Sequence, residues 1–139
     1  MSGKDHKVAA LLEGVETGPH DPHFAGYFRC FNEQKFYEAH DVLEALWLQD
    51  RNGPDGDFFK GLIQFAGAFV HLQKKRPRPA WKLFRLCTIY LAKYPSPHLA
   101  LDVANVLRLA KRWGEAAQIL GSEGDLLAEQ SPPTLRLQT

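Results

Sequence analysis

The chain has little cysteine, and the cysteine it has is not arranged for metal or redox chemistry. Only two cysteines, Cys30 and Cys87, occur in its 139 residues. They form no CxxC pair, so the sequence indicates neither a zinc knuckle nor a redox motif. Both lie among apolar residues, and we expect them to be reduced thiols in the core.

A long hydrophobic run is also missing. The N-terminal segment has no apolar stretch of signal-peptide length, because Glu13 and Glu16 interrupt it. The most hydrophobic stretch, residues 58–72, is too short to span a bilayer and contains three polar side chains. The sequence therefore predicts a soluble cytoplasmic protein with no membrane partner, and a buried helix over this stretch.

Acidic side chains are absent from the middle of the chain. Residues 58–101 carry eight bases and no acid, whereas residues 1–57 carry eleven acids and five bases. Such a segment attracts phosphate or an acidic partner, unless acidic and basic helices pair within the fold. The densest basic cluster consists of Lys74, Lys75, Arg76, Arg78, Lys82 and Arg85.

Sustained alternation of polar and apolar residues, which is typical of half-buried strands, does not occur. Helical spacing instead predicts an all-α fold, a compact bundle of about six helices arranged as helical hairpins, with no sheet. We expect a single helical domain over residues 1–121 and a flexible C-terminal tail over residues 122–139. The expected helices cover residues 4–17, 21–31, 35–49, 57–75, 80–93 and 98–112, with a short seventh over 115–120.

The stretch 31–47 places titratable groups inside a strongly apolar helical pattern. Burial of an unpaired charge is costly, so such groups should face water, join a polar network or take part in chemistry. His40 and Glu44 are four residues apart and therefore share one helix face, which Trp47 continues. We expect Glu38 and Asp41 to flank this face, solvated or interacting with the helix dipole.

The next helix carries a second polar pattern. At 100° per residue, Lys60, Gln64 and His71 lie in one narrow stripe, and Gly67 beside them leaves room for a ligand. If the two helices are antiparallel neighbours, their polar faces meet in a cleft. The predicted cleft residues are Glu38, His40, Glu44, Trp47, Lys60, Gln64 and His71.

These residues resemble the signature of the family called domain of unknown function 309. The resemblance rests on Phe31-Asn32, then on residues 36–44 with Trp47, and then on residues 60–66 with His71. It covers about residues 25–105 and implies a small all-helical protein. The family implies no reaction, but it implies that the cleft residues belong to a shared signature.

Three functions agree with these patterns. The leading hypothesis is a binding or interaction domain with a His/Glu/Gln/Lys cleft, whose partner is a small anionic ligand or a protein. The second is a hydrolase or isomerase that uses His40 as a general base oriented by Glu44. The third is an RNA- or phosphate-binding module that uses the basic cluster, with nucleic acid the less favoured partner. The sequence leaves the cofactor unknown, and a metal site lacks a third strong ligand.

Overall fold

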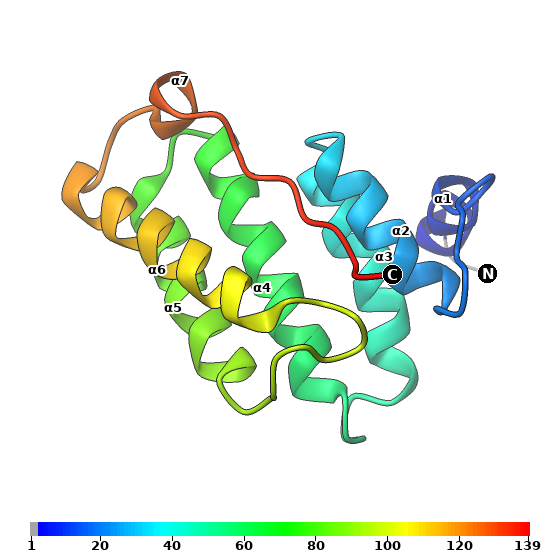
Figure 1. Cartoon of the computed structure of the whole chain (residues 1–139). Helices are drawn as coiled ribbons and strands as arrows, with labels where there is room; N and C mark the ends of the chain where they lie inside the picture. The colour runs from blue at the N-terminus through cyan, green and yellow to red at the C-terminus, as the bar shows by residue number, and fades with distance from the viewer. Residues whose placement is uncertain (1–2) are drawn as a thin grey trace.

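The computed structural model describes residues 3–139, which form seven helices (Figure 1). The prediction of an all-α bundle of about six helices is confirmed, because the seventh helix has only four residues. Within residues 3–139 there is no strand, only an isolated β-bridge between His98 and Leu101. The helices are α1 (Gly3–Leu11), α2 (Pro22–Asn32), α3 (Phe36–Gln49), α4 (Gly56–Gln73), α5 (Pro77–Leu91), α6 (Val103–Leu120) and α7 (Leu126–Glu129).

The helix starts follow the local chemistry of the sequence. Asp21 caps α2 by accepting a hydrogen bond from the His23 backbone N–H at 2.7 Å, and Pro22 occupies the first helical position. Helix α5 begins at Pro77, three residues before the predicted start. Proline is tolerated there because the first-turn N–H groups have no partner within the helix.

Two predicted helix ends are wrong. Helix α1 ends at Leu11 rather than at residue 17. The segments predicted as separate helices over 98–112 and 115–120 contain a single helix, α6, with Gly114 inside it. A Cβ atom on Gly114 would lie 3.2 Å from the Cβ of Phe84 on α5. This glycine therefore allows two helices to approach closely and does not end one.

Helix α4 lies at the centre of the bundle. It packs against α3 on one side and α5 on the other, and α2–α3 and α5–α6 complete a sequential array (Figure 1). Aromatic rings fill the centre: Phe65 stacks on Phe31 of α2 at 5.4 Å, and Phe69 meets Trp113 of α6 edge-on at 5.2 Å. Although α4 is apolar, no helix in the described part of the chain is long and apolar enough to cross a membrane.

The C-terminal segment, expected to be a flexible tail, contacts the rest of the domain. Figure 1 shows it running from α7 back across the bundle towards α2. Leu126 and Leu135 are buried, with 3% and 2% of their surface exposed. The Asn32 side chain of α2 donates to the Leu135 carbonyl at 2.7 Å and accepts from its N–H at 2.8 Å. Two leucines and one asparagine thus attach the segment to the domain.

Leu135→Ala should lower the free energy of unfolding by about 2–3 kcal/mol, because it removes a buried side chain and leaves a cavity. Urea denaturation followed by far-UV circular dichroism would measure this change. Arg136→Ala, at the exposed neighbouring position, is the control and should have little effect. Equal stability of the two variants would mean that Leu135 does not stabilise the fold.

Candidate functional site

A pocket of about 240 Å³ lies between α3 and α4. The structure brings three of the predicted cleft residues, His40, Gln64 and His71, together at its wall. Gly67 also lines the pocket, at the position where the sequence predicts room for a ligand. The remaining lining residues are Tyr37, Val70, Lys74 and Leu83.

His40 is held mainly by its neighbour in the chain. Its Nδ1 lies 3.2 Å from Oδ1 of Asp41, whereas its Nε2 lies 3.9 Å from Oε2 of Glu44, which is too far for a hydrogen bond. An ionised carboxylate only accepts, so His40 donates through Nδ1 and the neutral ring keeps a lone pair on Nε2. The carboxylate that orients this histidine is therefore Asp41.

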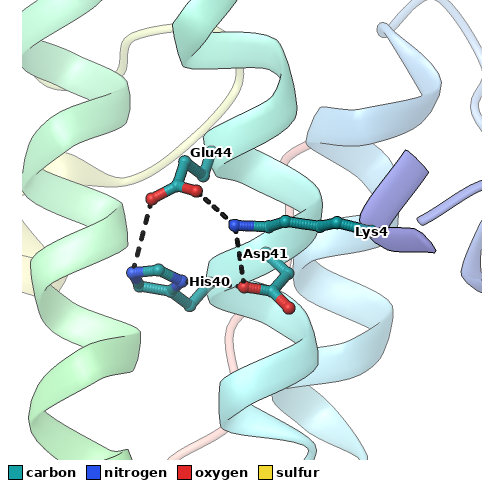
Figure 2. Close-up of polar contacts among 4 residues, drawn as sticks. All are labelled: Lys4, His40, Asp41 and Glu44. Atoms are coloured by element: carbon teal, nitrogen blue, oxygen red, sulfur yellow. Dashed lines mark hydrogen bonds and ion pairs between the residues drawn. The ribbon is translucent and has the colours of Figure 1, made fainter. Parts of the chain in front are cut away.

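The expectation that Asp41 is solvated is wrong. Asp41 is only 3% exposed, because α1 packs against this side of α3. Lys4 reaches in from α1, with its Nζ 3.5 Å from Oδ1 of Asp41 and hydrogen-bonded to Glu44 (Figure 2). This pairing, together with the His40 hydrogen bond, offsets the cost of burying the Asp41 carboxylate.

The contact between Lys4 and Glu44 shifts the pKa of both groups. The hydrogen bond from Lys4 lowers the pKa of Glu44 below its usual value, and the charges of Lys4, His40 and Lys60 act in the same direction. The same hydrogen bond raises the pKa of Lys4. Both groups therefore carry their charges at neutral pH.

Four predicted cleft residues do not line the pocket. Lys60 lies over the Trp47 ring, with its Nζ 4.4 Å from the ring centroid, in a cation–π contact. Glu44 interacts with both sides: its Oε2 lies 3.9 Å from Nε2 of His40, and the charge of Lys60 lowers its pKa. Glu38 does not line the pocket, and its charge raises the pKa of Cys30 on α2. The predicted cleft is thus divided into a pocket, an adjoining charged cluster and one separate glutamate.

The surroundings of His71 at the pocket wall favour the neutral form of its ring. Burial lowers the pKa of His71, and the positive charges of Arg76 and Lys74 lower it further. Its Nδ1 is buried, and no residue of the described chain forms a hydrogen bond with it. Protonation of this ring is therefore disfavoured unless a negative charge lies nearby.

Members of the basic cluster line different hollows of the surface. Lys74 lines the pocket between α3 and α4, whereas Arg78 and Arg85 line hollows between α5 and α6. The remaining members, Lys75, Arg76 and Lys82, are exposed. Phe84, which a nucleic-acid interface would use for base stacking, is 1% exposed and belongs to the core.

Sequence reasoning missed Lys4 and Tyr37 as parts of this region. Asp41 was expected to flank the face of His40 and Glu44, but its burial was missed. A signal for Lys4 exists, since it lies four residues before Val8 on α1 and Val8 is buried. The face of α1 that docks through Val8 therefore also carries Lys4 towards α3. Asp41 gives no such signal, because its burial depends on which side of α3 this helix covers.

Residues 3–139 contain no group of three or more His, Cys, Asp or Glu side chains placed to hold a metal ion. The fold and the pocket define a small all-helical protein with a small cavity, lined by both polar and apolar side chains, between two neighbouring helices. Residues 24–83 match the family model described as "Domain of unknown function (DUF309)", which confirms the resemblance found in the sequence. Every residue that lines the pocket lies within this matched segment. Neither the curated proteins nor the solved structures gave a match to the chain.

Lys4→Met should remove at least about 0.5 kcal/mol of stability at neutral pH, because it breaks the partly exposed pair with Glu44 and also removes a positive charge beside the buried Asp41. The folded-state pKa of Glu44 is lowered, so its stabilisation is complete above the unfolded pKa and is lost as the pH falls through the folded pKa. The difference in unfolding free energy between wild type and variant should therefore shrink on acidification. Urea denaturation at a series of pH values would measure it.

Lys7→Met is the matched control on the same helix, because Lys7 lies over Tyr37 rather than beside Glu44. It should leave the pH dependence of stability unchanged. A Lys4→Met difference that stays constant down to about pH 3 would exclude Glu44 as the titrating partner.

Proposed function

We propose that this chain is a binding domain whose pocket between α3 and α4 takes a small anion, such as a carboxylate or phosphate. The observation that carries the proposal is the chemistry of the lining. Its polar side chains are Tyr37, His40, Gln64, His71 and Lys74, and no carboxylate is among them. Apart from His40, which donates its Nδ1 proton to Asp41, each can donate a hydrogen bond to a ligand, and Lys74 adds a positive charge. At about 240 Å³ the pocket suits a ligand smaller than a drug-sized molecule.

Two further features support an anion at this place. The hydrogen bond from Nδ1 to Asp41 fixes the orientation of the His40 ring at the pocket wall. A Cβ atom on Gly67 would lie 3.2 Å from Cδ1 of Leu83, so glycine keeps the pocket open at this point. A ligand here would have donors from both helices.

Binding of an anion should raise the pKa of His71 towards its usual value, because the added negative charge offsets the nearby charges of Lys74 and Arg76. NMR titration of the imidazole signals with inorganic phosphate and, separately, with acetate would measure this shift. Lys74→Gln should weaken binding by about fivefold. His98, paired with Asp55 outside the pocket, is the internal reference.

Lys75→Gln is the matched control, since it removes the same charge one residue away and does not touch the pocket lining. It should bind as the wild type does. The proposal fails if neither anion moves the His71 signals, or if Lys75→Gln weakens binding as much as Lys74→Gln.

One observation favours an enzyme as the second candidate, a hydrolase or isomerase with His40 as general base. Asp41 accepts the Nδ1 proton of His40, and such a pair orients a histidine for proton transfer at Nε2. Hydrolysis of p-nitrophenyl acetate should then fall to the buffer rate in His40→Gln, and His98→Gln should keep the wild-type rate. Equal rates in wild type and His40→Gln would exclude this hydrolase activity.

The proposed cellular location of the protein is the cytoplasm. Cys30 and Cys87 are both free and buried, and burial raises the pKa of each thiol. Unpaired thiols are typical of proteins in reducing compartments.

A further inference from the structure

A second hollow, larger than the α3–α4 pocket, lies between α5 and α6, the last two long helices of the sequential helix array. Its volume is about 610 Å³, and its wall is mostly apolar. Trp81 and Phe84 of α5 face Leu107 and Ala110 of α6 across it. We call this hollow the α5–α6 groove.

The groove extends along both helices. A smaller hollow of about 210 Å³ continues it, lined by Arg78, Trp81, Gln118 and Gly121. Trp81 lines both hollows, which shows that they adjoin. From Trp81 to Ala92 the α5 side of the groove is about 16 Å long, which is about three helical turns.

The groove lies where the helix array stops. From α2 to α6 each helix packs against the next one, but α7 contacts α4 and α6 instead of covering the α5–α6 pair. Ile89 on the groove wall is consequently 52% exposed. An apolar groove with an exposed isoleucine is typical of a surface that another helix covers.

The charges around the groove define the chemistry of that helix. Arg78, Arg85 and Lys111 line the two hollows, and Glu115 is the single acid among the lining residues. Residues 76–112, which include α5 and most of α6, carry eight bases and one acid. Carboxylates beside the groove would be attracted, whereas basic groups would be repelled.

We propose that the α5–α6 groove binds an acidic amphipathic helix of a partner protein. The apolar stripe of this helix lies against Trp81, Ile89 and Leu107. Carboxylates on its flanks face Arg85 and Lys111. The bound helix continues the array by one element, and this surface is separate from the α3–α4 pocket.

A synthetic peptide of about 14 residues tests the proposal, with leucines at i, i+3, i+4 and i+7 and glutamates on the other face. Fluorescence anisotropy of the labelled peptide should show binding to the full chain. A peptide with lysine in place of every glutamate should bind at least about tenfold more weakly. Ile89→Ser should weaken binding of the glutamate peptide by about tenfold, as should Arg85→Glu combined with Lys111→Glu.

Ile119→Ser is the matched control, because Ile119 is 87% exposed on α6 and does not line the groove. It should bind the glutamate peptide as the wild type does, and so should Lys74→Gln, which alters the α3–α4 pocket. Equal binding of the two peptides, binding that survives Ile89→Ser, or no binding would each overturn the proposal.

Two other occupants would also overturn it. A concentration-dependent dimer in sedimentation experiments that Ile89→Ser abolishes would assign the groove to a second copy of this chain. Binding of a single-stranded RNA of mixed sequence that needs Arg85 and Lys111, without binding of the peptide, would assign it to nucleic acid.

Discussion

The burial of α4 on most sides is the constraint on which the rest of the structure depends. Its aromatic residues pack against α2, α3, α5 and α6, so a polar side chain on this helix has few directions open to it. Gln64 and His71 lie on the narrow face that remains, opposite His40 of α3. The pocket exists because two helices with polar stripes pack against each other at those stripes and cannot bury them in the aromatic core.

The orientation of His40 at the pocket also depends on α1. Asp41 contacts Lys4 on one side and His40 on the other, so the orientation of a pocket-lining ring rests on a carboxylate that α1 covers. Such a carboxylate is costly to bury without partners. The N-terminal helix is outside the family-matched segment, yet it completes the electrostatic surroundings of residues within it.

Much of the fold could be predicted from helical spacing, and the cap Asp21 with Pro22 marks the start of α2. The start of α5 at Pro77 was not predicted, since the expected helix begins at residue 80. Gly114 was misinterpreted because a glycine that permits close packing and one that ends a helix look alike in sequence. For the site, the helical spacing of His40, Gln64 and His71 predicted that these side chains come together. The burial of Asp41 could not be predicted, since it depends on a contact with α1, whose Lys4 lies 37 residues before Asp41 in the chain.

The two end segments of the described chain both contact the α2–α3 hairpin. Lys4 ties α1 to α3, and Leu135 ties the C-terminal segment to α2. Any movement of the α2–α3 hairpin away from α4 would therefore have to carry both end segments with it or release one of them. A movement of the hairpin that leaves its end segments behind would break the Lys4 and Leu135 contacts, so these contacts oppose opening of the pocket by that route.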